Sequence, residues 1–142
     1  MTIHLVKLCV GAEGVDDLRD WRERGLAERQ QQNRSPHMFH TTRMWPRREP
    51  ELLDGGSLYW VIKGMILVRQ PIFKLEECIG EDDIRRCKIL LEPKLILTQP
   101  MPRRPFQGWR YLKPEDAPKD LPHGRAQLDQ ALAGELAELG LL

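Results

Sequence analysis

Arginines and aromatic residues are interleaved in two short stretches of this chain that both contain prolines. Guanidinium groups bind phosphates in a bidentate manner, and aromatic faces stack on unpaired bases. Neither stretch, 34–48 or 99–113, contains an acidic residue, so a formal net charge of +1 conceals two basic blocks. The candidate phosphate-binding residues are Arg43, Arg47, Arg48, Lys63, Arg69, Arg103, Arg104 and Arg110, and the candidate base-stacking residues are Trp45, Tyr59 and Trp109.

The same residues also have an ordinary structural interpretation, in which the tryptophans fill the core and the arginines cover it through cation–π contacts. Trp60 lies inside an apolar segment, so we expect it in the core. Lys63 and Arg69 flank a glycine bend and extend the basic surface if they lie beside it. The binding hypothesis therefore depends on whether folding brings the two basic blocks together.

Motifs for catalysis, nucleotide phosphates and metals are missing from the sequence. It contains no Gly-x-Gly-x-x-Gly, no P-loop and no His-Glu-x-x-His. His37 and His40 lie three residues apart, but a structural zinc site needs about four ligands. We therefore expect no cofactor and no metal.

The cysteines and the apolar segments bear on where the protein works. Cys9, Cys78 and Cys87 are odd in number and none belongs to a Cys-x-x-Cys pair. Lys7 interrupts the N-terminal apolar segment before it reaches the length of a signal-peptide hydrophobic region. This favours reduced thiols in a cytoplasmic protein. No segment reaches the roughly 18 apolar residues of a membrane span, so we expect no membrane insertion.

The hydrophobic pattern predicts one α+β domain over residues 1–142, a length at which a real core can form. Strands joined by turns favour a mostly antiparallel curled sheet or small open barrel, with an N-terminal helix and a C-terminal helix. The sequence lacks the βαβ repetition that is typical of a parallel sheet. The proline-rich segment 99–105 cannot form a central strand. Strands are expected over 3–10, 38–45, 58–68, 72–79, 84–91, 95–98 and 106–112, and helices over 15–32, 50–53 and 126–139. The segment 58–68 is either one long strand bent at Gly64 or two joined strands.

Four strings within the chain carry a resemblance to a known family. They are HTTRMWPRR from His40, GGSLYWVIKG from Gly55, LVRQ from Leu67 and RRPFQGWRYL from Arg103. Together they resemble a bacterial, chiefly alphaproteobacterial, family defined only as domain of unknown function 1489, over nearly the whole chain. This resemblance implies a bacterial cytoplasmic protein and supplies no activity.

A looser likeness is architectural. The Tyr59–Trp60 strand, the basic residues and the flanking helices are similar to PUA-like small β-barrels, which include the ASCH and EVE domains. Many of those domains read RNA or modified bases. Their diagnostic motifs are absent from this chain, and a fold does not fix a function.

The favoured hypothesis is a small module that binds single-stranded RNA or another nucleic acid without catalysis, with an affinity that falls steeply with salt. An alternative is a small enzyme acting on a nucleotide or phosphorylated metabolite, with His40, Glu49 or Glu51 as acid or base. That enzyme needs a concave pocket where a histidine or carboxylate meets the arginines.

A third hypothesis is a protein-interaction domain. It requires that the leucine face of the helix expected over 126–139 is exposed to a partner. The ordinary alternative is that Leu128, Leu132 and Leu136 pack against the sheet.

Overall fold

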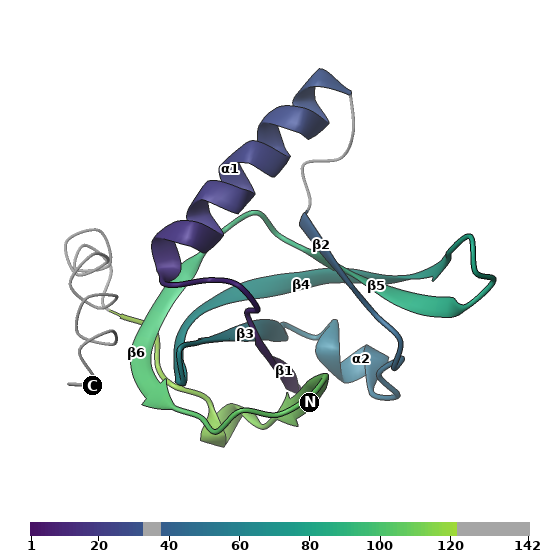
Figure 1. Cartoon of the computed structure of the whole chain (residues 1–142). Helices are drawn as coiled ribbons and strands as arrows, with labels where there is room; N and C mark the ends of the chain where they lie inside the picture. The colour runs from purple at the N-terminus through teal and green to yellow at the C-terminus, as the bar shows by residue number, and fades with distance from the viewer. Residues whose placement is uncertain (33–37, 122–142) are drawn as a thin grey trace.

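The computed structural model describes residues 1–32 and 38–121 (Figure 1). The C-terminal helix predicted over 126–139 lies outside these residues. Within them, no helix is both long and apolar enough to span a membrane. The elements are β1 His4–Leu8, α1 Val15–Gln31, β2 Met38–Thr42, α2 Glu49–Leu52, β3 Ser57–Ile62, β4 Met65–Ile79, β5 Arg85–Leu91, β6 Ile96–Pro102, β7 Trp109–Leu112 and the 3₁₀ turn η1 Pro114–Asp116.

The strands form one mixed seven-stranded sheet in the order β2-β5-β4-β3-β1-β7, with β6 paired to β4. Its end strands β2 and β7 are not paired with each other in the described part of the chain, so the sheet is curled but not closed. Every ladder is antiparallel except that of β1 and β3, which is parallel. The α+β class and the mostly antiparallel sheet are therefore confirmed.

The parallel pair is the one exception within the mostly antiparallel sheet that the sequence predicted. Leu5 lies opposite Leu58 and Leu8 opposite Val61. Parallel strands need a long crossover, and here α1, β2 and α2 return the chain from the end of β1 to the start of β3. Because this crossover contains a strand of its own, it is not a simple βαβ unit, and the sequence therefore shows no βαβ repetition.

Two strands run through prolines at which the sequence analysis ended them. β4 passes Pro71, whose carbonyl accepts a hydrogen bond from the Glu92 amide at 2.9 Å. β4 pairs with β6 up to Arg69 and with β3 up to Pro71 itself, and it pairs with β5 from Ile72 onward, so the proline falls where the partners of β4 change. β6 includes Pro100 and Pro102 and forms its ladder with β4 alone, a position in which prolines are tolerated.

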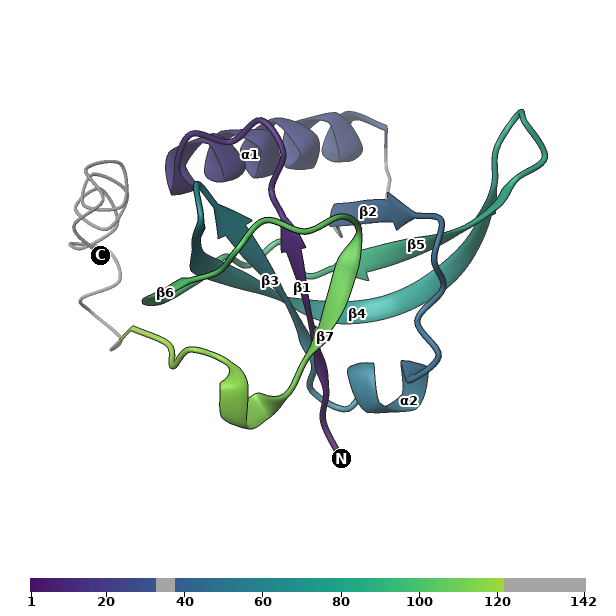
Figure 2. The ribbon, with the colours of Figure 1, turned by 60° about the horizontal axis from the view of Figure 1, so that its bottom comes forward.

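Side chains alternate across the sheet, so each face has its own core. One face buries a large cluster that includes Leu58, Trp60 and Trp109. The other buries a smaller cluster that includes Tyr59 and Val61. In Figure 2, α1 lies on one side of the sheet and η1 on the other. Consecutive residues such as Tyr59 and Trp60 therefore serve two separate surfaces.

Candidate functional site

The two basic blocks meet where β7 lies against the loop that follows β2. The indole N–H of Trp109 donates to the Met44 carbonyl at 3.0 Å. The hydroxyl of Tyr111 accepts from the backbone amides of Arg47 at 2.9 Å and Arg48 at 3.2 Å. The polypeptide segments that carry the two blocks are thus in direct contact.

The arginine side chains at this contact do not converge into one pocket. The Arg48 guanidinium lies 5.6 Å from the centre of the Tyr111 ring and is ion-paired with Glu51. Arg110 lies between Trp109 and Tyr111 in β7, so its side chain leaves the opposite face. There Arg110 and Arg103 lie 5.4 and 5.2 Å from the centre of the Phe106 ring. β7 therefore separates the two groups of arginines.

The other candidates of the two blocks occupy varied environments. Arg43, Arg47 and Arg104 are exposed. Trp45 is half-buried, with the Arg85 guanidinium 4.6 Å from its ring centre. Trp109 is only 6% exposed, which favours a structural role for its ring.

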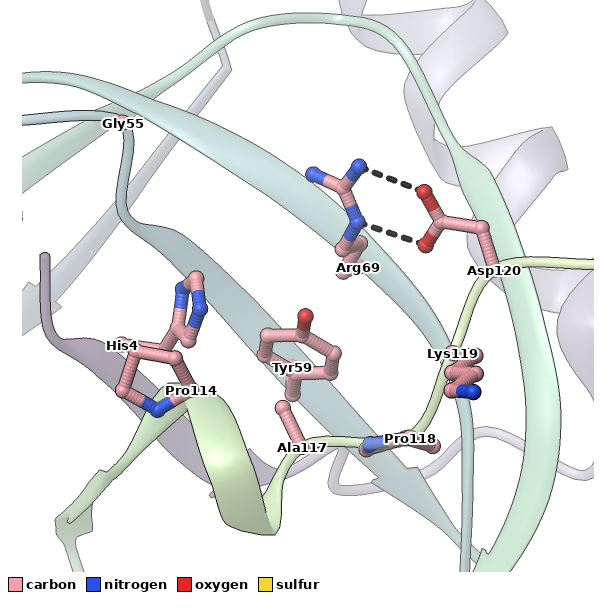
Figure 3. A pocket seen from close by; sticks show the side chains of 9 residues that line it. All are labelled: His4, Gly55, Tyr59, Arg69, Pro114, Ala117, Pro118, Lys119 and Asp120. Carbon is pink, nitrogen blue, oxygen red and sulfur yellow. Dashed lines mark hydrogen bonds and ion pairs between the residues drawn. The ribbon is translucent and has the colours of Figure 1, made fainter.

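The candidates outside the blocks are also separated. Lys63 forms an ion pair with Glu13. Tyr59 and Arg69, by contrast, do come together in a pocket that the sequence analysis did not delimit, which we call the polar pocket (Figure 3). It has a volume of about 370 Å³ and is lined by His4, Gly55, Tyr59, Arg69, Pro114, Ala117, Pro118, Lys119 and Asp120.

The floor of the polar pocket is formed by β1, β3 and β4, and its wall by the segment after β7. This wall is pinned to β6, because the Gln99 amide donates to the Lys119 carbonyl at 2.8 Å and the Leu121 amide donates to the Leu97 carbonyl at 2.9 Å. The pocket thus joins residues from both ends of the described chain, from His4 to Asp120.

A chain of hydrogen bonds fixes the side chains of the polar pocket. Arg69 donates to both carboxylate oxygens of Asp120, at 2.8 Å from Nε and 2.7 Å from Nη2. Its Nη1 donates to Ser57 Oγ at 2.8 Å, and the Ser57 amide donates to His4 Nδ1 at 3.0 Å. The bonds from Arg69 lower the pKa of Asp120. Burial, and next the charge of Arg69, lower the pKa of His4.

A second pocket lies on the other face of the sheet, between α1 and strands β1 to β3. This aromatic pocket has a volume of about 340 Å³. Trp21 on α1, which is 38% exposed, and Trp60 on β3 supply aromatic rings, and Phe39 on β2 is also a lining residue at the exposed edge of the pocket. The full lining is Lys7, Leu8, Cys9, Val10, Leu18, Trp21, Met38, Phe39, His40, Trp60, Gln70 and Leu91.

Hydrogen bonds hold the inner wall of the aromatic pocket. The indole N–H of Trp60 donates to Gln70 Oε1 at 2.9 Å, and Gln70 Nε2 donates to the Glu92 carbonyl at 3.0 Å. His40 packs edge-to-face on Trp60 with ring centres 5.7 Å apart. The expectation that Trp60 lies in the core is confirmed, since it is 7% exposed.

The titratable groups of the aromatic pocket leave one positive charge in it. Burial, and next the Lys7 charge, lower the pKa of His40 to about 4, so its imidazole is neutral at pH 7. Burial raises the pKa of the Cys9 thiol to about 11 and lowers the pKa of Lys7. Asp and Glu are absent from the lining, so Lys7 is its sole charged group at neutral pH.

Of the residues that line this pocket, the sequence pattern indicated His40 as a candidate functional residue but not Lys7, Trp21 or Gln70. A signal for Lys7 was present, because Leu5 and Lys7 of β1 and Cys9 just after it alternate toward one face, so Lys7 lies in line with two buried residues. Among the described residues, no group of three or more His, Cys, Asp and Glu could hold a metal ion.

The fold and its pockets define a small α+β domain with a curled mixed sheet and a ligand-sized concavity on each face. The chain belongs to the family described as protein of unknown function DUF1489, whose model matches residues 5–142, and this confirms the resemblance noted in the sequence. Neither the curated proteins nor the solved structures include a match to this chain. The likeness to PUA-like barrels stays a prediction.

Proposed function

We propose that this protein binds single-stranded nucleic acid, with RNA as the preferred candidate, and that one unstacked base binds in the aromatic pocket. The observation that carries the proposal is the combination of the Trp21 and Trp60 rings with a single lysine in one open pocket of about 340 Å³. Pockets of roughly 300–1,000 Å³ suit small organic ligands. A base stacked on an aromatic side chain gains about 1–3 kcal/mol, and single strands present bases already unstacked.

The polar groups of the pocket suit a base joined to a phosphate. The Lys7 ammonium donates to a base carbonyl or to a phosphate oxygen, and the neutral imidazole of His40 offers one donor and one acceptor. An acid-free lining of this kind favours an anionic strand.

The exposed arginines that continue from β2 are the proposed phosphate contacts. Arg43 directly follows β2, the strand that carries Phe39 and His40, and Arg47 follows in the same loop. Arg48 and Arg69 are already paired with Glu51 and Asp120, so they contribute less. Under this proposal the base is held by the pocket and the strand by the loop after β2.

The test is fluorescence anisotropy with a panel of single-stranded RNA and DNA oligonucleotides, at low and at physiological salt. Trp21→Ala and Lys7→Met are compared with Ile79→Ala and Lys74→Met, exposed residues at distant positions of β4. We expect Trp21→Ala to weaken binding about tenfold or more. The control variants should bind like the wild type. Absence of binding at low salt, or equal binding by all four variants, overturns the proposal.

An enzyme acting on a nucleotide is the second candidate, favoured by one observation. His40 and Lys7 share the aromatic pocket and both have a lowered pKa, a pattern that is enriched at catalytic sites. Glu51, an acid or base candidate from the sequence, is instead occupied by Arg48. Conversion of a bound nucleotide by wild type but not by His40→Gln would favour the enzyme over a binding module.

A further inference from the structure

The polar pocket is independent of the surface proposed to bind nucleic acid. Tyr59 and Arg69 line it, whereas their chain neighbours Trp60 and Gln70 line the aromatic pocket. Since consecutive residues of a strand point to opposite faces, the sheet lies between the two pockets. A ligand of the polar pocket therefore belongs to a second site.

Hydrogen-bond donors dominate the polar pocket. His4 Nδ1 accepts from the Ser57 amide, so the neutral ring carries its proton on Nε2. In Figure 3 the hydroxyl of Tyr59 points toward the space between His4 and Arg69. Lys119, an exposed residue of the wall, also lines the pocket, and its long side chain carries an ammonium. The one carboxylate, Asp120, already accepts two hydrogen bonds from Arg69.

Arg69 is held in place with donor capacity to spare. A guanidinium has five N–H groups, and the three bonds to Asp120 and Ser57 leave one on each terminal nitrogen. The salt bridge with Asp120 keeps the group oriented, and the wall that carries Asp120 is anchored to β6. The donors are therefore already fixed before a ligand binds, which reduces the conformational entropy lost on binding.

We infer that the polar pocket is a binding site for a small molecule that carries an oxyanion, either a phosphate or a carboxylate group. The oxyanion accepts hydrogen bonds from His4 Nε2, the Tyr59 hydroxyl and Lys119, and lies beside the fixed Arg69 guanidinium. With Arg69 and Asp120 neutralising each other and His4 neutral, Lys119 leaves the lining with one net positive charge. Donors and charge both select an acceptor-rich, anionic group.

The test is a titration of the wild-type protein with sodium phosphate and separately with sodium acetate, followed by the ¹H–¹³C NMR signals of the His4 and Tyr59 rings. Sodium chloride at matched ionic strength is the control titration. We expect saturable shifts at both rings with at least one oxyanion, and the tighter of the two identifies the ligand class. A shift that chloride reproduces, or that only single-stranded RNA produces, overturns the inference.

Matched variants locate the site. Lys119→Met removes the pocket ammonium, and Tyr59→Phe removes one hydroxyl while keeping the buried ring. We expect them to raise the Kd about tenfold and about threefold, respectively. Lys113→Met and Tyr111→Phe make the same changes outside the pocket and should leave the Kd unchanged. Equal Kd values for all four variants refute the site. Trp21→Ala changes the aromatic pocket and should leave the Kd for the oxyanion unchanged.

Discussion

At the scale of single residues, His40 is a neutral imidazole because burial and the Lys7 ammonium both disfavour its protonated form. In the unfolded chain it takes up a proton near its ordinary pKa of 6.5, but in the fold only near 4. Between these pH values the unfolded state binds more protons, so the free energy of unfolding falls as the pH drops. The shift corresponds to about 3 kcal/mol at most, and solvent screening of the half-buried imidazole reduces this figure.

The prediction is that His40→Gln flattens this dependence. Chemical denaturation at several pH values from 7 to 5 should show a smaller loss of stability in the variant than in the wild type. His4 also has a lowered pKa and contributes a loss of the same sign, so His4→Gln is measured in parallel. Identical pH profiles for wild type and His40→Gln would show that His40 is already solvated in the fold.

Gln70 is a fully buried amide, with 0% exposure, that hydrogen-bonds to Trp60, Glu92 and the Met38 sulfur. It accepts from the Trp60 indole and donates to the Glu92 carbonyl. Gln70→Met keeps the side-chain volume but removes the hydrogen-bond partner of the Trp60 indole N–H and of the Glu92 carbonyl. Each buried polar group left without a partner costs about 1–3 kcal/mol. We expect urea denaturation to show a loss of about 2–4 kcal/mol. Gln99→Met, at an exposed position of β6, should change stability by less than about 0.5 kcal/mol.

At the scale of elements, Gly56 sits where β1, α2 and the start of β3 crowd together. A Cβ at this position would lie 2.4 Å from the carbonyl oxygens of Ile3 and of Leu52, both backbone atoms. The Gly56 amide donates to that Leu52 carbonyl, and its own carbonyl accepts from Ile72, so the backbone is held on both sides. The close approach therefore requires glycine.

Gly56→Ala is predicted to lower the free energy of unfolding toward the upper end of the roughly 1–3 kcal/mol that overpacking costs. Gly108→Ala is the informative comparison, because Gly108 has φ +70° with open space around it. There the cost is conformational strain alone, about 1 kcal/mol. Thermal or urea unfolding of both variants distinguishes crowding from strain, and an equal loss would contradict the crowding.

The elements that the sequence predicted are those set by local pattern. Hydrophobic alternation or periodicity located α1, β1, β3 and β5, because burial of one face is written into neighbouring residues. The parallel pairing of β1 with β3 and the passage of β4 through Pro71 depend on partners distant in sequence. No local pattern contains that information.

The candidate sites were predictable to a similar extent. Tyr59 and Arg69 were named as candidates, but their companions His4 and Asp120 come from the two ends of the described chain. The basic blocks do meet, as the binding hypothesis required, yet strand alternation across Trp109, Arg110 and Tyr111 divides their side chains. That division is local and was available from the sequence, whereas the pockets are products of the tertiary fold.

At the scale of the whole molecule, the arginines of the two basic blocks lie on opposite faces of the sheet. The loop with Arg43 and Arg47 packs on the face that carries Trp109 and Tyr111, which is also the face of the aromatic pocket. Arg103 and Arg110 flank Phe106, which packs on the opposite cluster. A strand whose base enters the aromatic pocket should therefore depend on the first pair of arginines.

This division makes a quantitative prediction for the salt dependence of RNA binding. Each phosphate neutralised on a single strand contributes about −0.7 to the slope of log K against log salt concentration. Arg43→Ala with Arg47→Ala should reduce the magnitude of the slope by up to about 1.4, whereas Arg103→Ala with Arg110→Ala should leave it near the wild-type value. Anisotropy titrations at four or more salt concentrations measure the slopes. Equal reductions by both pairs would mean that the strand crosses the edge of β7 and contacts both faces, and the single-face interpretation would then be wrong.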